Sequence, residues 1–506
     1  MTRLATAELA RLAARLPVPT YDRDRVVPGI VHLGVGGFHR AHQARYLDRL
    51  MNQGLALDWG IVGVGLLPAD RRMRDVLLAQ DCLYTVVEKE ADGELRPRVV
   101  GSIIDYLFAP DDPEAVLRRM ADPATRIVSL TITEGGYHLN QATGGFDASD
   151  PGIRADLVPG ATPRTAFGYI VEALARRREA GAAPFAVMSC DNIQGNGHMA
   201  SEMIAAFATL RDPDLGSWIA AEVPFPSSMV DRITPVTSAE DRELLRRRFG
   251  VEDGWPVVCE PFSQWALEDR FPGGRPPLAE AGVQLVDDIE PYELMKLRLL
   301  NASHQALCYL GYLAGYRYAH EVAQDPLFVG FLLGYMEREA TPTLAPVPGV
   351  DLAAYRRQLV ERFANPSVRD TLARLCAESS DRIPQWLVPV IRHRLDHGGE
   401  VGRSALVVAA WARYAEGVDE EGQPIEVVDR RREEVMARAA RQREDPLAFL
   451  RDRDLFGHLV DEPGFTEPYA EALASLHAVG ARRTLEVTER SAAAPDVPGP
   501  VGPGSR

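Results

Sequence analysis

The chain has 506 residues, enough for two or three domains. It carries 56 Lys and Arg against 72 Asp and Glu, a net charge of -16, which argues against nucleic acid or an anionic membrane surface as a partner. Five scattered cysteines without a CxxC pair argue against a disulfide framework and favour the cytoplasm. No apolar run approaches the roughly 18–20 residues that span a bilayer, and the first residues lack the apolar core of a signal peptide.

The first half of the chain alternates between short apolar runs and helical patterns. We predict strands at 29–33, 60–65, 84–88, 98–104, 126–133 and 185–189, with helices between them that include 38–52, 113–120 and 163–179. Such alternation predicts a mostly parallel sheet with helices on both faces. The predicted fold class is therefore α/β, with an N-terminal Rossmann-type dinucleotide-binding domain.

From about residue 290 the pattern becomes almost entirely helical. The predicted helices cover 291–317, 324–339, 351–364, 367–377, 384–396, 403–416 and 428–443. We therefore predict a Rossmann-type domain over 1–285 and a mostly α-helical substrate domain over 286–490. The remaining residues, 491–506, are rich in Ala, Pro and Gly and are predicted to be disordered.

A glycine-rich turn lies between the first predicted strand and the first helix. Gly34 and Gly36 would let the backbone approach a pyrophosphate, which the helix N-terminus then attracts. The alternative is a tight turn that merely needs a positive φ. The third glycine of the usual fingerprint is replaced by His39, which implies looser helix packing or a variant turn. The further cofactor-binding candidates in this segment are Gly37, Phe38 and Arg40, the last interpreted as a phosphate or packing contact.

The end of the second predicted strand bears on the choice of dinucleotide. Asp70 lies just beyond it and is the candidate acceptor for the ribose hydroxyls. Arg71 and Arg72 adjoin it, and an arginine there could instead contact a 2′-phosphate. We favour NAD, because Asp70 would repel that phosphate, and NADP stays open.

Two more strand ends point to the same edge of the sheet. Thr133 and Glu134 end one strand, and Asp191 and Asn192 end another. Ligands of open α/β sheets bind at the carboxyl ends of the strands. Thr133 is therefore a cofactor-binding candidate, Asn192 a ligand of a substrate oxygen and Glu134 a group that exchanges protons with water. Alternatively, Asp191 and Asn192 are turn or N-cap residues.

Three polar residues stand out in the largely apolar helical stretch 292–313. Lys296, Asn301 and His304 fall within an arc of roughly 140° on a helical wheel, so one cleft can contain all three. Hiding them without partners is costly. The functional interpretation is a base, a carbonyl-polarising amide and a hydroxyl-binding imidazole. The structural interpretation is a core helix whose polar groups bond to neighbouring backbone or whose lysine reaches solvent.

Taken together, these segments resemble the mannitol dehydrogenase family of polyol-specific long-chain dehydrogenases. The resemblance runs from about Tyr21 to about Leu485 and rests on GIVHLGVGGFHRAHQARYLD, WGIVGVGL, SLTITEGGYH, SCDNIQGNG, MVDRITP, KLRLLNASH and DRIP. It implies a Rossmann-type domain and a helical domain with the active site between them. It also implies hydride transfer without zinc, in a monomer or homodimer.

The resemblance also implies roles for single residues. Lys296 matches the family's catalytic lysine, and Asn192 and Asn301 match its two carbonyl-binding asparagines. The substrate-binding histidine matches His304, and the acidic gate near the cofactor resembles Glu134. On the substrate side the matches are Asp231 and Arg382. Gln385 stands where the family often has a lysine, which removes a possible hydroxyl contact.

The expected reaction is reversible hydride transfer between a secondary alcohol of a linear polyol and NAD, with D-mannitol and D-fructose as the pair. A free lysine has a pKa of about 10.4, and burial and the cationic cofactor should lower the pKa of Lys296 so that it acts as the base. Fructuronate or tagaturonate reduction, and arabinitol or sorbitol oxidation, are alternatives within the family. A nucleotide-sensing protein that has lost catalysis is the alternative from another class.

The histidine pattern bears on a possible metal site. Eleven histidines supply no HExxH motif and no cysteine–histidine cluster, so no metal site is predicted. His39 and His42 are interpreted as structural. The expected partners are small polyols and ketoses.

Overall fold

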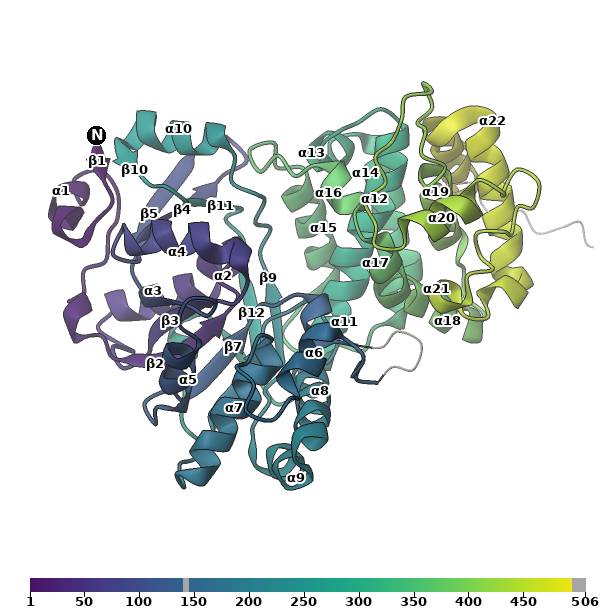
Figure 1. The fold of residues 1–506 in the computed structure, drawn as a ribbon. Helices are drawn as coiled ribbons and strands as arrows, with labels where there is room; N and C mark the ends of the chain where they lie inside the picture. Colours follow the sequence, from purple (N-terminus) through teal and green to yellow (C-terminus); the bar gives the residue numbers. More distant parts are fainter. Residues whose placement is uncertain (140–144, 494–506) are drawn as a thin grey trace, which may run out of the picture. The chain divides into compact units, whose positions relative to one another are not determined.

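The computed structural model describes residues 1–139 and 145–493, apart from the side chains of Glu134 and of residues 491–493. The chain forms two compact units, Met1–Leu294 and Met295–Arg506 (Figure 1). The division falls within a continuous helical stretch that begins at Glu290, whereas the sequence analysis places the boundary after residue 285. In the two described segments, no helix is both long and apolar enough to cross a membrane.

The first unit is built around a five-stranded parallel sheet. Its strands are β2 (Pro28–Leu33), β3 (Gly60–Gly65), β6 (Ile103–Phe108), β7 (Ile127–Leu130) and β8 (Ala186–Ser189). They lie in the order β6–β3–β2–β7–β8, and every neighbouring pair is parallel. The chain therefore builds outward from β2 on one side and then returns to its other side. This confirms the predicted Rossmann-type α/β fold and places the change of direction between β2 and β7.

Helices cover both faces of this sheet (Figure 1). Val31 and Val128 point to the face covered by α5 (Pro113–Ala121), α7 (Ala166–Glu179) and α8 (Asn196–Arg211). Ile30 and Ile127, one residue earlier in each strand, point to the opposite face, which is covered by α3 (Gln43–Asn52) and α4 (Arg71–Leu78). The alternation of side chains along each strand thus fills two apolar cores.

Several strands differ from the prediction. The strand predicted at 98–104 is two strands, β5 (Leu95–Val100) and β6, because Gly101 and Ser102 break the run. β4 (Tyr84–Lys89) pairs with β5 and with β11 (Val257–Cys259) instead of joining the main sheet. Other short strands, missed in the sequence, form two further sheets: β9 (Ser228–Asp231), β12 (Gln264–Glu268) and β13 (Gln284–Val286), and β1 (Thr2–Arg3) with β10 (Val251–Glu252).

The helix predicted at 38–52 is broken into two. α2 (Gly37–Ala41) ends at His42, whose φ of -118° and ψ of -92° are not helical, and α3 follows. The remaining α-helices of this unit are α1 (Leu9–Leu12), α6 (Pro151–Asp156), α9 (Pro213–Glu222), α10 (Ala239–Phe249) and α11 (Glu290–Met295). The break lets α3 pack along the sheet while α2 stays beside the glycine turn.

In the second unit, every regular element within the described residues is a helix. Two segments, η6 (Lys296–Asn301) and η7 (Tyr335–Ala340), are π-helical. The α-helices are α12 (Ala302–Leu313), α13 (Ala319–Ala323), α14 (Pro326–Gly334), α15 (Leu352–Phe363), α16 (Leu372–Cys376), α17 (Ser379–Trp386), α18 (Val388–Asp396), α19 (Gly402–Tyr414), α20 (Arg432–Ala439), α21 (Arg453–Phe456) and α22 (Pro463–Ala493). This confirms the predicted helical domain. α12 lies in its core and contacts α16 and α19.

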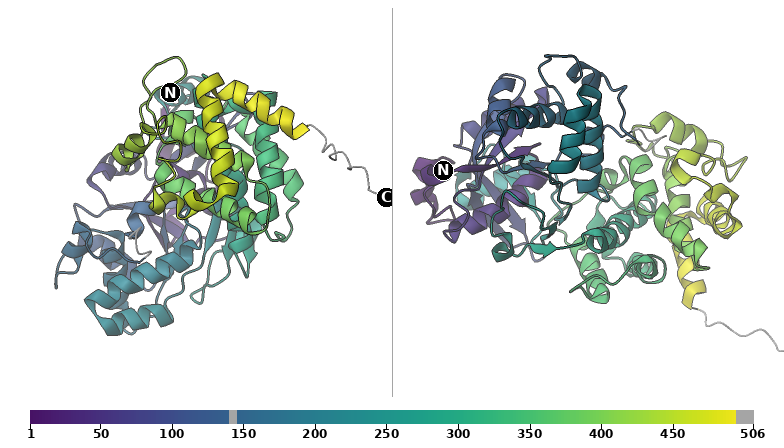
Figure 2. Two further views of the ribbon diagram at one scale, coloured as in Figure 1. Left: turned by 90° about the vertical axis from the view of Figure 1, so that its right-hand side faces the viewer. Right: turned by 90° about the horizontal axis from the view of Figure 1, so that it is seen from below.

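The last helix was not predicted from the sequence. α22 is bent at Gly480, where φ is 79° and ψ is 172°, and its two legs appear in yellow in Figure 2. Residues 494–506 of the predicted tail lie outside the described residues. The cysteines, all five of them buried, are free thiols.

Candidate functional site

The strand register of the first unit brings four segments to one edge of the main sheet. Leu33 of β2 pairs with Val64 of β3 and with Leu130 of β7, and Leu130 pairs with Ser189 of β8. The strands are parallel, so the segments that follow them emerge on the same side. These segments contain the glycine turn, Asp70, Thr133 and Asn192, as the sequence predicts for a dinucleotide-binding edge.

Gly34 and Gly36 of the turn differ in the space around them. Gly34 has a φ of +89°, and a Cβ there would lie 2.2 Å from the carbonyl oxygen of Thr131. A Cβ on Gly36 would meet only the Gly34 oxygen, at 4.0 Å, and one on Gly37 would lie 3.6 Å from Thr234. Gly34 is therefore required by the fold itself. Gly36 leaves open space above the backbone, which is what a closely approaching pyrophosphate needs.

His39 takes the place of the third glycine by stacking. Its ring lies 3.4 Å from that of His32 in β2, with an angle of 11° between the planes. His32 in turn bonds Ser129 at 2.8 Å and Thr131 at 2.9 Å. Burial lowers the pKa of His32 to about 3, and burial followed by the proximity of His32 holds the pKa of His39 well below its ordinary value. Two neutral rings thus join α2 to the sheet in a variant of the usual turn.

The other candidates in this segment are held by the protein itself. Arg40 is buried and donates hydrogen bonds to the carbonyl oxygens of Trp255 and Gly36, the latter at 3.3 Å. Phe38 stacks on His42 with ring centres 4.9 Å apart. Arg40 thereby ties the glycine turn to a distant loop. Its contact with a cofactor phosphate stays a prediction.

Asp70 lies directly after β3 and is partly exposed. Its carboxylate accepts a hydrogen bond from the Leu67 amide at 2.9 Å, which orients it at the sheet edge. Arg71 forms an ion pair with Asp111 at 2.9 Å, and Arg72 stacks 4.8 Å above an indole ring. Arg71 is therefore already engaged by a carboxylate. The geometry keeps Asp70 as the candidate ribose ligand.

Asp191 organises the loop that follows β7. It accepts hydrogen bonds from the amides of Ile132 at 3.2 Å and Thr133 at 2.9 Å, and from the Tyr137 hydroxyl at 2.9 Å. Thr133 adopts a positive φ of 62°, which a non-glycine residue holds only with such support. Asp191 thus joins the ends of β7 and β8. Glu134 begins the short helix Glu134–Tyr137, and its side chain lies outside the described part.

The second strand end carries Asn192 and a residue that the sequence analysis missed. Asn192 is exposed, whereas Asn196 is buried and donates to the carbonyl oxygens of Asp191 at 3.0 Å and Ser228 at 2.7 Å. Asn196 therefore joins β8 to β9. Asp231, the buried last residue of β9, is placed through this link. The second Asn of SCDNIQGNG was the signal for this role.

In the second unit Lys296 and Asn301 lie in a π-helix, and His304 lies in α12, which follows it directly. Lys296 begins η6 and Asn301 ends it, and the Ala302 amide bonds to Leu297, five residues back. A hydrogen bond between residues five apart defines the π-helix. In a regular α-helix, residues five apart are separated by roughly 140° around the axis, and the wider π-helical turn makes this angle between Lys296 and Asn301 smaller. Lys296, Asn301 and His304 are 6%, 5% and 9% exposed. Such π segments are frequent at functional sites.

The side-chain amide of Asn301 is held without an internal partner. Its buried Oδ1 has no hydrogen-bond partner among the residues that the structure describes. A buried, unsatisfied polar atom costs about 1–3 kcal/mol. The His304 ring rests against Phe363 with centres 4.6 Å apart. This segment therefore carries a buried, unsatisfied acceptor, which a hydrogen-bond donor of a bound ligand would satisfy.

Tyr335 supports the π segment from η7. Its hydroxyl donates to the Arg298 carbonyl oxygen at 3.1 Å, in the middle of η6, and Arg298 donates to the Thr343 carbonyl oxygen at 2.6 Å. Tyr335 is fully buried, and burial, followed by the charge of Glu339, raises the pKa of its hydroxyl well above the ordinary value. The hydroxyl therefore remains a donor. We interpret Tyr335 as a positioning residue for Lys296 and Asn301.

The change Tyr335→Phe tests this interpretation. We expect a loss of about 1–3 kcal/mol of stability, because the Arg298 carbonyl loses its donor, and a fall in kcat of about tenfold at unchanged affinity for the dinucleotide. Tyr469→Phe is the matched control, because the buried Tyr469 hydroxyl has no hydrogen-bond partner in the described residues. Equal kcat in both variants, measured by steady-state kinetics, would leave Tyr335 a purely structural residue.

Two further charged residues, Arg382 and Glu293, form hydrogen bonds to backbone groups. Arg382, on α17, is partly exposed and donates to the carbonyl oxygens of Leu375 at 3.0 Å and Arg374 at 3.2 Å. Glu293, which the sequence analysis did not single out, is buried and accepts from the Gly195 amide at 2.8 Å. It precedes Lys296 by three residues, which was its sequence signal. Arg382 is thus fixed on one side by backbone, and its contact with substrate stays a prediction.

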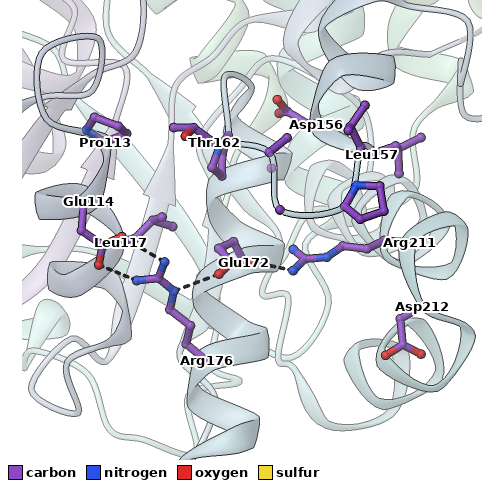
Figure 3. Close-up of a pocket in the computed structure, with 16 residues that line it drawn as sticks. Pro113, Glu114, Leu117, Asp156, Leu157, Thr162, Glu172, Arg176, Arg211 and Asp212 are labelled. Atoms are coloured by element: carbon purple, nitrogen blue, oxygen red, sulfur yellow. Dashed lines mark hydrogen bonds and ion pairs between the residues drawn. The ribbon is translucent and has the colours of Figure 1, made fainter.

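A further cavity lies elsewhere in the first unit. It has a volume of about 690 Å³ and is lined by residues of α5, α7, the ends of α6 and α8 and the loop between α6 and α7, none of them a predicted site residue (Figure 3). Over residues 1–139 and 145–493, no three His, Cys, Asp or Glu side chains form a group that could hold a metal ion.

Both units match models of known protein families. Residues 28–280 match the mannitol dehydrogenase Rossmann domain, and residues 288–477 match the mannitol dehydrogenase C-terminal domain. Among curated relatives, mannitol 2-dehydrogenase of Phaeosphaeria nodorum is 48% identical over 96% of this chain and 85% of its own. The enzyme of that name from Aspergillus fumigatus is 47% identical over 96% of this chain and 98% of its own.

Solved structures extend the likeness to the fold. Pseudomonas fluorescens mannitol 2-dehydrogenase, in a ternary complex with NAD and D-mannitol, is 46% identical with a TM-score of 0.91, over 97% of this chain and all of its own. A substrate-free D-sorbitol dehydrogenase is 37% identical with a TM-score of 0.85, over 96% of this chain and all of its own.

Proposed function

The chain belongs to the mannitol dehydrogenase family, and we propose that it oxidises D-mannitol to D-fructose with NAD and catalyses the reverse reduction. The observation that carries the proposal is the buried segment from Lys296 to His304, with its amine, amide and imidazole on one helix. The structure of a relative with NAD and D-mannitol supports the choice of cofactor and substrate.

The residues at the sheet edge fit a dinucleotide. The open space at Gly36 suits a pyrophosphate, and the partly exposed Asp70 carboxylate suits two ribose hydroxyls. The nicotinamide ring of NAD, when bound, accepts the hydride from the alcohol carbon. Gly37, Phe38, Arg40 and Thr133 complete the proposed cofactor site. Asp70 disfavours the 2′-phosphate of NADP, so we propose NAD as the preferred cofactor.

Lys296 is proposed as the general base. In polyol oxidation its amine takes the proton of the substrate hydroxyl, while the hydride leaves the carbon that bears this hydroxyl. In ketose reduction the amine returns the proton to the oxygen. The amine must be uncharged to take the proton. Its side chain is buried, at 6% exposure. We propose that Glu134 exchanges this proton with solvent.

Asn192 and Asn301 are proposed to stabilise the negative charge that develops on the substrate oxygen. Their amide groups donate hydrogen bonds to it, as an oxyanion hole does. His304 and Asp231 are proposed to bind the flanking hydroxyls, and Arg382 the far end of the polyol. A lysine and two amides supply both the base and the polarisation, so we propose that the reaction needs no zinc.

The glycine turn allows a matched pair of variants. Gly34→Ala should lower both stability and NADH affinity, because its Cβ would lie 2.2 Å from a backbone oxygen at a φ of +89°. Gly36→Ala should keep the melting temperature within about 2 °C, since only one atom lies as near as 4.0 Å, yet weaken NADH binding at least about tenfold. Thermal melts and fluorescence titration measure both. Unchanged NADH affinity in Gly36→Ala would place the pyrophosphate elsewhere.

Removal of metal tests the proposal of a zinc-independent reaction. After prolonged dialysis against a chelator, we expect turnover with D-mannitol and NAD to stay within about twofold of the starting value, since no step assigned here uses a Lewis acid. Inductively coupled plasma mass spectrometry on the dialysed protein confirms that metal is gone. Recovery of a lost activity on adding Zn²⁺ would contradict the proposal.

A substrate panel tests the proposed function itself. We would follow NADH and NADPH oxidation with fructose, fructuronate, tagaturonate and xylulose, and NAD reduction with mannitol, arabinitol and sorbitol. The highest kcat/KM should fall on fructose with NADH and on mannitol with NAD. A preference for fructuronate or tagaturonate would identify a uronate reductase, although Gln385 supplies no second cation beside Arg382. Dinucleotide binding without turnover on any substrate would favour a sensing protein.

A further inference from the structure

A second, smaller cavity in the first unit is lined mainly by arginines. Its volume is about 290 Å³, and its walls include Arg45 and Arg49 of α3, Arg232 after β9 and Glu88 of β4. Ser263 adds a hydroxyl. Three cations and one carboxylate leave a local charge of +2 in a chain whose net charge is -16. The pocket is therefore a positive spot on an acidic protein.

The single acid of this pocket is already engaged. Glu88 pairs with Arg232 at 2.7 Å, and Arg232, only 2% exposed in its side chain, also donates to the carbonyl oxygens of Ala41 at 2.8 Å and Glu260 at 2.9 Å. Asp48, on the same helix as Arg45, is buried and accepts from the Tyr21 hydroxyl at 2.9 Å. Both carboxylates lie near Arg45, but among the described residues neither forms an ion pair with Arg45 or Arg49.

Arg45 and Arg49 are the uncompensated cations. Within residues 1–139 and 145–493, Arg45 forms no hydrogen bond and no ion pair, and its Nε is buried without a partner. Arg49 makes one bond, to the Ala281 carbonyl oxygen at 3.3 Å. Burial, followed by the nearby charge of Arg98, lowers the pKa of Arg45. The buried Nε of Arg98 also has no partner among the described residues.

The larger cavity of Figure 3 shows the contrast. There Arg176 pairs with Glu114 at 2.7 Å and with Glu172 at 2.9 Å, and Arg211 also pairs with Glu172 (Figure 3). Those cations and carboxylates neutralise one another within the wall. In the arginine pocket the cations outnumber the acids, and an unpaired, half-buried guanidinium is unfavourable unless an anion joins it.

We propose that the arginine pocket binds a phosphoryl group, either free phosphate or a small phosphate ester. Guanidinium groups match phosphate oxygens in pairs of hydrogen bonds, and a doubly charged oxyanion neutralises the local charge of +2. None of the pocket residues belongs to the proposed dinucleotide or polyol sites. Arg232 follows Asp231 and holds the end of α2 through the Ala41 carbonyl, so the pocket borders elements of both.

Thermal melts with added anions, at constant ionic strength, test the proposal. The wild-type protein, saturated with NADH to fill its dinucleotide site, should gain about 2–5 °C in melting temperature with inorganic phosphate or glycerol 3-phosphate, and much less with acetate. Arg45→Met and the double variant with Arg49→Met should weaken the phosphate affinity at least about tenfold, as measured by isothermal titration calorimetry. Arg45→Lys keeps the positive charge and is the more conservative change, so it tests the pocket even if Arg45→Met does not fold. Its phosphate affinity should lie between those of the wild type and Arg45→Met.

The control is Arg248→Met, which removes an exposed arginine of α10 and should keep the full phosphate response. A larger response to the ester than to free phosphate would identify the ester as the ligand, and the reverse order free phosphate. Two results would overturn the proposal: a phosphate response that is present without NADH but lost with it, or a response in the double variant equal to that of the wild type. NADH affinity is measured separately, so failure of the dinucleotide site is distinguishable from failure of this pocket.

Discussion

Replacement of Lys296 by alanine should lower the turnover of mannitol about 10³–10⁴-fold while leaving NADH affinity nearly intact. The amine is 6% exposed and begins the π-helical segment, so nothing else on that segment offers a base at this position. General acid–base catalysis by a positioned side chain contributes about 10²–10⁴-fold, and loss of the polar contact to the substrate oxygen adds to the effect. Steady-state kinetics and fluorescence titration of NADH measure the two quantities.

Two further experiments separate a chemical role for Lys296 from a structural one. Lys296→Met keeps the length of the side chain, so its fold and NADH affinity should match those of the wild type while its turnover stays as low as that of the alanine variant. Small primary amines added to Lys296→Ala should restore part of the turnover, because the cavity left by the side chain admits a free base. Turnover within tenfold of wild type in either variant would remove Lys296 from the role of base.

Replacement of Asn301 by alanine should separate activity from stability. Removal of one oxyanion donor lowers kcat about 10²–10³-fold. The buried Oδ1 of Asn301 has no hydrogen-bond partner among the described residues, so its removal should leave the free energy of unfolding unchanged or raise it. Kinetics and urea denaturation give the two values. A loss of stability above about 2 kcal/mol would show instead that the amide is part of the structural network.

Ser303 provides the matched control on the same helix. Its hydroxyl is also buried, and it has no partner within the described part of the chain. Ser303→Ala should therefore change stability as Asn301→Ala does and leave kcat within about threefold of wild type, because Ser303 is assigned no contact with substrate. A fall in kcat as large as that of Asn301→Ala would mean that any change in this segment disturbs catalysis.

The main sheet of the first unit was predictable because its strands are short apolar runs with helices between them. The glycine turn, Asp70 and Asn192 follow strands in the sequence, and parallel pairing carries them to one edge. The small sheets were not predictable. β9, β11, β12 and β13 have three to five residues each. β4 pairs with β5, the next strand, and with β11, which comes much later in the chain, so no local period reveals these sheets.

In the candidate site, too, the sequence predicts the residue types but not the contacts between distant segments. Lys296, Asn301 and His304 are conspicuous in an apolar helical pattern, and their residue types suggest the chemistry. The widened helical turn that draws Lys296 and Asn301 together left no sign in that pattern. Tyr335 bonds to the Arg298 carbonyl of this turn from another π-helical segment, a contact that only the tertiary structure reveals. Likewise, Asp191 and Asn196 become loop anchors only through contacts with residues 32 to 59 positions away.

The sequence by itself determined the two-part architecture, the dinucleotide turn and the identity of the polar residues on the buried helix, because periodicity and glycine placement are local properties. Only the tertiary structure decided the π-helical spacing of those residues, the stacking of His39 on His32 and the meeting of Arg45 and Arg49 of α3 with Arg232 in one pocket. Each of these arises where side chains from distant segments meet. Their energies depend on burial and partners that the linear order of residues does not specify.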